Sequence, residues 1–112
     1  MSPPSTVRRT GTESELRELA RYFYALKEIW RLRMIRALAA AEELTVSQLA
    51  DRLRISQPLV SWHLRRLRQA RIVQVRRVGR ESYYSLDRSQ IAHYQQLLES
   101  LLHPPQSHQK GA

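Results

Sequence analysis

The side chains best suited to chemistry are polar and basic groups between residues 56 and 80 of this 112-residue chain. One predicted helix carries most of them, and we expect the following to be exposed on it or at its start: Ser56, Gln57, Pro58, Ser61, Trp62, His63, Arg65 and Arg66. A predicted hairpin carries the others, which are Arg76, Arg77 and Arg80. Glutamine and serine can hydrogen-bond to base edges, and arginine favours guanine or phosphates. These residue types therefore indicate contact with DNA, with the hairpin arginines at phosphates or in a flanking minor groove.

The charge of the chain is concentrated in the same region. The chain has 19 Lys and Arg against 10 Asp and Glu, a net charge of +9, and residues 45–86 hold 9 of the basic residues and 2 of the acidic ones. An isolated charged helix face is usually only solvated. Here the charges coincide with a basic hairpin and with a helix-turn-helix pattern, in which a turn at Arg54-Ile55-Ser56 joins a short predicted helix to a longer one. Double-stranded DNA is therefore the partner that we expect.

The composition excludes several other classes of protein. Without cysteine the chain has no disulfide, no thiolate metal site and no thiol nucleophile. No nucleophile and base, phosphate loop or spaced carboxylate pair indicates an enzyme, and we expect no cofactor. No run of about 18 apolar residues spans a membrane, and residues 1–12 lack the apolar segment of a signal peptide. We therefore expect a cytoplasmic protein.

The elements that must position these side chains follow from hydrophobic periodicity. Apolar residues three or four apart predict helices over residues 14–29, 31–42, 45–54, 56–70 and 88–102, and the first two are either separate or continuous. A change to period two, with a turn at Gly79 and Arg80, predicts a hairpin between the last two helices. The fold class is mainly α with a small β-hairpin, in the order helix, helix, helix, helix, strand, strand, helix. We expect one domain over residues 13–102 between flexible tails at 1–12 and 103–112.

Helix starts carry recognisable capping residues. Thr45 and Gln48 form a predicted capping box, and Asp87 with Gln90 caps the last helix. Ser56 is the predicted N-cap of the helix over 56–70, with Pro58 in its first turn. On that helix we expect the core face to consist of Leu59, Val60, Leu64 and Leu67. Trp62 stands outside this stripe, and the sequence leaves open whether it contacts a DNA groove or a second subunit.

Four segments in this order resemble the ArsR-type (arsenic-repressor-like) winged helix-turn-helix regulators. They are Phe23–Leu26 with Arg31–Ile35, Leu44–Ala50 (LTVSQLA), Ser56–Leu64 (SQPLVSWHL) and Val78–Leu86 (VGRESYYSL). The resemblance implies a homodimeric repressor that binds an operator of two half-sites through the helix 56–70 and the wing 76–82. Recognition helices of such a dimer lie about 34 to 36 Å apart, or a multiple of it. The first and last helices would form the dimer interface, through Leu16, Leu19, Phe23, Leu26, Ile91, Tyr94, Leu98 and Leu101.

The sequence departs from the family pattern in three respects, which are the break between the first two helices, the end of the helix 45–54, and sensing. Glu28-Ile29-Trp30 stands where the family commonly has Asp-Pro-Thr, and Arg54 stands where it often has glycine. The third departure concerns sensing, because many family members bind metal or arsenic through cysteines where this chain has Thr45 and Ser47, and others bind zinc on the last helix. The family's zinc pattern on the last helix falls on Asp87, Ser89, Ser100 and His103, and two of these are serines. We therefore expect no metal site, and the inducer is unknown.

Two other classes of function stay open. A net charge of +9 also suits an architectural or nonspecific nucleic-acid binder. A winged-helix protein-interaction module would instead use Trp62, Tyr83 and Tyr84 to hold a protein partner.

Overall fold

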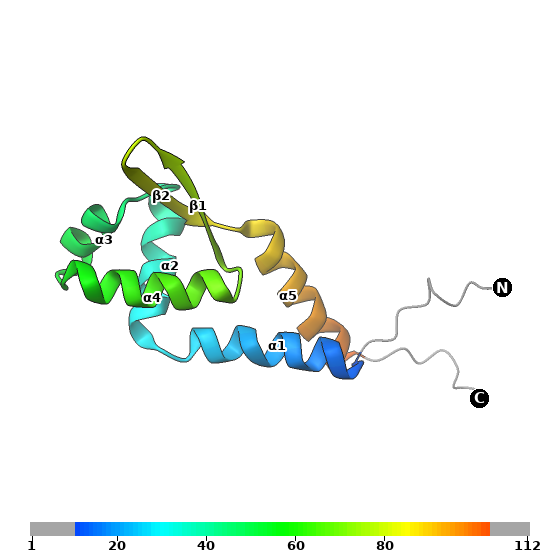
Figure 1. Ribbon diagram of the computed structural model, residues 1–112. Helices are drawn as coiled ribbons and strands as arrows, with labels where there is room; N and C mark the ends of the chain where they lie inside the picture. The colour runs from blue at the N-terminus through cyan, green and yellow to red at the C-terminus, as the bar shows by residue number, and fades with distance from the viewer. Residues whose placement is uncertain (1–10, 104–112) are drawn as a thin grey trace, which may run out of the picture.

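The structure is a computed structural model, and it describes residues 11–103. Its elements are α1 (Glu13–Leu26), α2 (Ile29–Ala41), α3 (Val46–Leu53), α4 (Gln57–Gln69), β1 (Val73–Val78), β2 (Glu81–Leu86) and α5 (Arg88–Leu102), as Figure 1 shows. The predicted fold class and element order are confirmed. The predicted tails lie almost wholly outside the described residues. Within residues 11–103, no helix is both long and apolar enough to cross a membrane.

The first two helices are separate, which settles the alternative that the sequence left open. α1 ends at Leu26 with Lys27 as its C-cap, and Glu28 adopts an extended conformation with φ −98° and ψ 128° before α2 begins. The Arg31 and Leu32 amides then donate to the Glu28 carbonyl at 3.0 and 3.2 Å, which closes the first turn of α2. The break therefore forms without the Asp-Pro-Thr of the family pattern.

The domain begins with a capping box that the sequence analysis did not identify. The Thr12 hydroxyl accepts from the Glu15 amide at 3.2 Å, and the Glu15 carboxylate accepts from the Thr12 amide at 3.3 Å. Such reciprocal bonds satisfy helix N–H groups that have no partner within the helix. Thr12 therefore belongs to the folded domain rather than to the tail in which we expected it.

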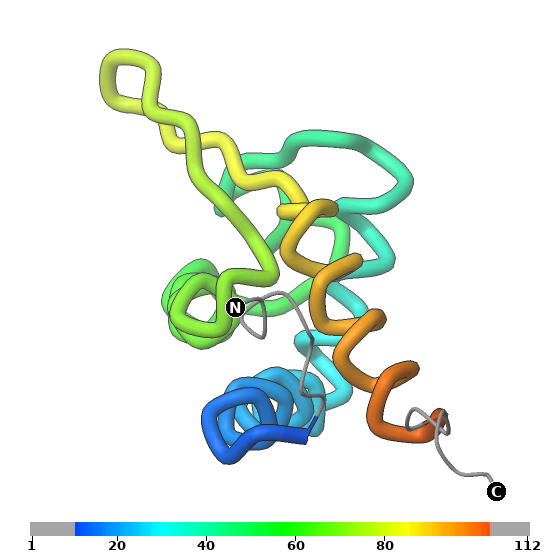
Figure 2. The backbone as a smooth tube through the Cα atoms, turned by 90° about the vertical axis from the view of Figure 1, so that its right-hand side faces the viewer, coloured from blue at the N-terminus to red at the C-terminus, as the bar shows by residue number. Residues whose placement is uncertain are grey.

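The hairpin is held at its base by a third extended segment. β1 and β2 pair antiparallel from Val73 with Leu86 to Val78 with Glu81. Leu44, between α2 and α3, exchanges two backbone hydrogen bonds with Tyr84, at 3.0 and 2.9 Å. In Figure 2 the turn of the hairpin projects away from the helices. The base of the wing is thus fixed to the helical body, whereas its tip extends into solvent.

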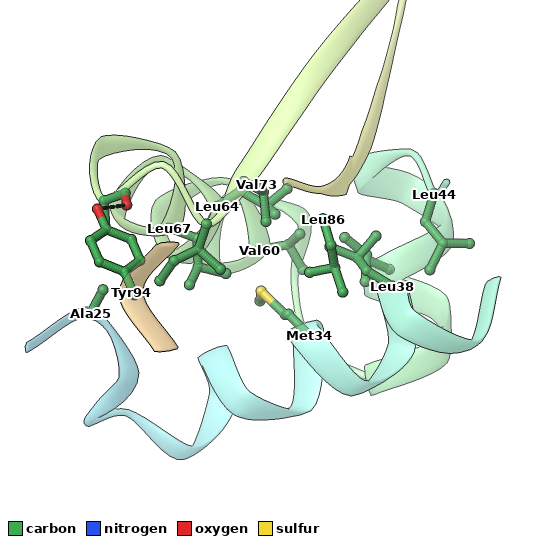
Figure 3. Packing of buried hydrophobic residues seen from close by; sticks show 14 residues of the cluster. Ala25, Met34, Leu38, Leu44, Val60, Leu64, Leu67, Val73, Leu86 and Tyr94 are labelled. Atoms are coloured by element: carbon green, nitrogen blue, oxygen red, sulfur yellow. Dashed lines mark hydrogen bonds between the residues drawn. The ribbon is translucent and has the colours of Figure 1, made fainter. Parts of the chain in front are cut away.

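The core lies where α2, α3, α4 and β1 meet. Its fully buried side chains are Met34, Leu38, Leu49, Val60, Leu64, Leu67 and Ile72. Figure 3 shows Met34 beneath the leucines and valine of α4. Because seven large apolar side chains converge from several elements, the position of α4 is determined by packing rather than by its own helix propensity.

Two residues predicted for the dimer interface are buried within the chain itself. Leu19 is 4% exposed and Tyr94 is 3% exposed. The Tyr94 hydroxyl donates to the Ala70 carbonyl at 2.7 Å, as Figure 3 shows, and its ring stacks on Tyr22 with centroids 4.3 Å apart. The prediction is wrong for these two residues because α1 and α5 pack against each other within one chain and cover part of each apolar stripe.

Candidate nucleic-acid interface

The helix-turn-helix is formed by α3, a short turn and α4. The Thr45 hydroxyl accepts from the Gln48 amide at 3.1 Å, and the Gln48 side chain accepts from the Thr45 amide at 2.9 Å. Ser56 caps α4 by accepting from the Leu59 amide at 3.3 Å, with Pro58 in the first turn. These predicted caps are confirmed, and they fix where both helices of the motif begin.

The turn between the two helices requires a left-handed residue. Arg54 has φ 59° and ψ 45°, and its amide donates to the Ala50 carbonyl at 2.8 Å. A residue with a Cβ atom in this conformation costs about 1 kcal/mol relative to glycine. The chain therefore keeps the turn geometry despite lacking the glycine that the family pattern often has.

The buried face of α4 differs from the predicted one at two positions. His63 is 5% exposed, whereas Leu59 is 37% exposed. Successive helical residues are about 100° apart, so positions 60, 63, 64 and 67 form one stripe and position 59 falls beside it. The predictions that His63 faces DNA and that Leu59 faces the core are both wrong. Val60, Leu64 and Leu67 are buried as expected.

His63 instead accepts a hydrogen bond inside the protein. The Arg31 Nε donates to the His63 Nδ1 at 3.2 Å. Because the guanidinium is always a donor, Nδ1 must carry a lone pair, and the ring proton of the neutral imidazole lies on Nε2. Burial lowers the pKa of His63 below its usual 6.5, the Arg31 charge lowers this pKa further, and Glu28 opposes the shift.

Protonation of His63 is expected to destabilise the fold at acidic pH. The lowered pKa means that the unfolded chain binds this proton more readily than the folded chain. The stabilisation that the neutral imidazole contributes should thus be fully present above pH 6.5 and should be lost as the pH falls through the folded-state pKa. The loss in the free energy of unfolding is about 1.4 kcal/mol for each unit by which the folded-state pKa lies below the unfolded-state pKa. Urea unfolding at several pH values between about 7.5 and about 5 measures this dependence.

His63→Gln is the control for this measurement, because a glutamine oxygen can still accept from Arg31 but does not titrate. The variant should lose the part of the pH dependence that His63 contributes, because the rest of the sequence is the same in both proteins. Parallel pH profiles for the two proteins would contradict the lowered pKa of His63 in the folded chain.

The exposed face of α4 is polar and basic. Among the predicted DNA contacts, Ser56, Gln57, Pro58, Ser61, Trp62 and Arg65 are exposed, and Arg66 is half-buried. The Trp62 side chain is 43% exposed, and the Arg66 guanidinium lies over its ring at 4.5 Å from the centroid. Trp62 is therefore not part of the core, and its ring is presented beside a cation. Arg68, which the sequence analysis did not single out, is also exposed on this helix.

The three wing arginines differ in the contacts that their side chains make. The Arg76 guanidinium binds both oxygens of Glu43 at 2.8 and 3.0 Å and lies over the Tyr83 ring. This pairing lowers the pKa of the Glu43 carboxyl. Arg77 donates to the Ser82 hydroxyl at 2.9 Å. Arg80, at the exposed turn beside Gly79, has no side-chain hydrogen bond or ion pair to residues 11–103, so it is the wing arginine most available to an external anion.

Asp87 caps the N-terminus of α5. It accepts from the Gln90 amide at 3.1 Å at the start of α5 and from the Ser89 hydroxyl at 3.0 Å. Its predicted role as an N-cap is confirmed.

Comparison with known proteins identifies the family. The family "Bacterial regulatory protein, arsR family" matches residues 30–75, which include α3, α4 and the start of β1. A transcriptional repressor SmtB homolog of a Synechocystis species is 46% identical over 72 residues, which make up 64% of this chain and 54% of that protein. An arsenic resistance transcriptional regulator of Pseudomonas putida is 42% identical over 64 residues, 57% of this chain and 50% of that protein. The chain thus spans about half the length of these curated relatives.

A solved structure extends the match to the whole fold. An ArsR-like transcriptional regulator from a Rhodococcus species superposes with a TM-score of 0.73 at 30% identity, over 79% of this chain and 82% of that one. Since both the sequence of the motif and the arrangement of the surrounding helices agree, the chain belongs to the ArsR family of bacterial transcriptional regulators.

Proposed function

We propose that the chain is a homodimeric, sequence-specific repressor that binds a two-half-site operator through the helix 56–70 and the wing 76–82. The observation that carries this proposal is the exposed face of α4, where Gln57, Ser61 and Arg65 stand free of the core. Gln and Arg at such positions suit the base edges of a major groove. Arg80 at the wing tip suits a flanking phosphate or minor groove. A protein with this task acts on DNA in the cytoplasm and needs no catalytic activity.

The second chain of the dimer would cover apolar side chains that the protomer leaves exposed. Leu16, Phe23 and Leu101 are 37%, 45% and 42% exposed, and Leu26, Ile91 and Leu98 are half-buried. Exposed apolar groups concentrated on α1 and α5 favour a subunit interface at this end of the molecule. These six residues remain our prediction for that interface.

The proposal is tested by competition between DNAs. Labelled DNA from upstream of the protein's own gene is bound at physiological salt, and its displacement is monitored by fluorescence anisotropy. Scrambled DNA should displace it only at a concentration at least about 10³-fold higher than unlabelled upstream DNA does. Equal competition would favour an architectural nucleic-acid binder. Absence of binding to either DNA would leave the protein-interaction module as the remaining reading of this surface.

Arg80→Ala is expected to weaken binding to every DNA by a similar factor. Its guanidinium can contact a phosphate, and each such contact contributes about 0.9 to the slope of log affinity against log salt. Titrations at several salt concentrations should therefore give a slope that is smaller by about 1. An unchanged slope at low salt would contradict the assignment of the wing.

Gln57→Ala is the matched comparison, because this residue is expected to contact a base. The variant should lose about 1–3 kcal/mol at one base pair of the preferred site while its salt slope stays constant. A uniform loss over all sequences would instead place Gln57 at the DNA backbone.

A further inference from the structure

A pocket of about 410 Å³ lies between α1 and α4. The two helices run side by side with α5 beyond them, as Figures 1 and 2 both show. In the part of the chain that the structure describes, the lining combines small apolar groups with cations and contains no acidic residue: Ala20, Arg21, Tyr24, Ala25, Arg31, Arg66, Gln69 and Ala70. The volume falls within the range of small-molecule sites, which is about 300–1,000 Å³.

The most informative group in this lining is the Arg31 guanidinium. Arg31 is only 6% exposed, yet it has no carboxylate oxygen within 4.0 Å among residues 11–103. Its Nε donates to His63, and its Nη1 donates to the Ala25 carbonyl at 3.3 Å. A guanidinium has five N–H donors, so these two bonds leave three for other acceptors. Buried cations are normally paired, and an anion entering the pocket would supply the missing counter-charge.

The rest of the pocket determines what kind of anion fits. Arg21 and Arg66 add positive charge, whereas three alanines and the Tyr24 ring offer apolar contact. The planar fork of arginine matches a carboxylate with two parallel hydrogen bonds. We propose that this pocket binds a small organic carboxylate, with its carboxylate at Arg31 and its apolar body against the alanines and Tyr24.

Such a ligand would act directly on the helix that we assign to DNA. Arg66 lines the pocket and also lies over the Trp62 ring, and Arg31 holds His63 of the same helix. A bound carboxylate that engages Arg66 withdraws a positive charge from the DNA-facing surface. The ligand is thus an inducer that lowers DNA affinity, and this consequence rests on the proposed repressor function.

The first experiment measures binding to the full chain without DNA. Isothermal titration calorimetry with 1-naphthoate should show one saturable site per chain, at least about tenfold tighter than the neutral 1-naphthalenemethanol of similar shape. Equal affinity for both compounds would overturn the assignment to an anion. Lack of saturation by 1-naphthoate up to about 1 mM would overturn the pocket as a site for this class of ligand.

Paired variants then place the ligand. Gln69→Glu puts a negative charge on the pocket wall and should weaken 1-naphthoate by about tenfold. Gln95→Glu makes the same change at an exposed position of α5 outside the lining and should leave the affinity unchanged. Ala20→Leu fills the pocket without changing its charge and should also weaken binding. Equal affinities in all three variants would show that 1-naphthoate binds elsewhere.

The second experiment adds DNA. Saturating 1-naphthoate should lower the affinity for the preferred DNA by about fivefold or more, and Ala20→Leu should reduce this effect. If 1-naphthoate occupies the pocket but DNA affinity does not change, the inducer role is wrong. If the ligand-free chain binds no DNA, the proposed function fails, whereas the calorimetry still decides whether the pocket binds carboxylates.

Discussion

Leu64→Ala is expected to lower the free energy of unfolding by about 2–5 kcal/mol. Leu64 is 1% exposed and lies on the face of α4 that packs over Met34, as Figure 3 shows. Truncation removes buried apolar surface and leaves a cavity, because a core built from several elements collapses only partly around it. Domains of this size are stable by only about 5–15 kcal/mol, so the variant should approach the limit of folding. Urea unfolding followed by circular dichroism measures the loss.

Leu59→Ala is the matched control, since it deletes the same side chain from the same helix. Leu59 is 37% exposed, so its loss should cost no more than about 1 kcal/mol. If the two variants were equally destabilised, the rotation of α4 about its axis, and with it the burial of His63, would be wrong.

Phe23→Asp is expected to separate the proposed dimer into folded monomers. Phe23 is 45% exposed on α1, where we place the subunit interface. In a two-fold symmetric interface each substitution acts twice. Loss of about 1.5–3 kcal/mol of apolar burial per chain, together with a desolvated carboxylate, should raise the dissociation constant of the dimer at least about 100-fold. Analytical ultracentrifugation over a range of concentrations measures this change.

Ser14→Asp controls for an added acidic residue on α1, because Ser14 is exposed and polar in the first turn of that helix. It should keep the dimer, and circular dichroism should report native helix content for both variants. Phe23→Asp should also lose operator affinity, because two half-sites bound by one dimer reinforce each other. A Phe23→Asp protein that stays dimeric would move the interface away from this face of α1.

The parts of the fold that the sequence predicts best are those with local signals. The Thr45 and Gln48 box depends on residues three apart, and the hairpin depends on an alternation of two around Gly79. Thr12 and Glu15 have the same spacing as that box. We missed them because the Pro- and Ser-rich composition of the preceding residues suggested that the tail continued to residue 12.

Side-chain burial was harder to predict because residue type competes with helix geometry. We assigned His63 to the exposed face because histidine is polar, although its angular position lies within the buried stripe. The position is compatible with histidine only because Arg31, from another helix, supplies a hydrogen bond. Leu19 and Tyr94 lie on apolar stripes, as predicted. The spacing of a stripe does not show whether the residues that bury it belong to the same chain or to a second chain.

No pattern in the sequence predicts the pocket. Arg21, Arg31 and Arg66 belong to α1, α2 and α4, and no spacing relates them. They meet only because α1 and α4 lie side by side in the folded chain. An unpaired arginine becomes recognisable as a site when its burial and its neighbours are both known.

The contrast between the fixed base and the projecting tip of the wing has an evolutionary consequence. Leu44 and Tyr84 bind the base to the helical body, and Glu43 holds Arg76 just above it. Arg80 and Glu81, by contrast, are exposed beyond these anchors, and substitutions there leave the core untouched. In the mode of DNA binding that we propose, mutation of the tip alone can therefore change the preference for DNA that flanks a half-site, while α4 and its packing are inherited unchanged.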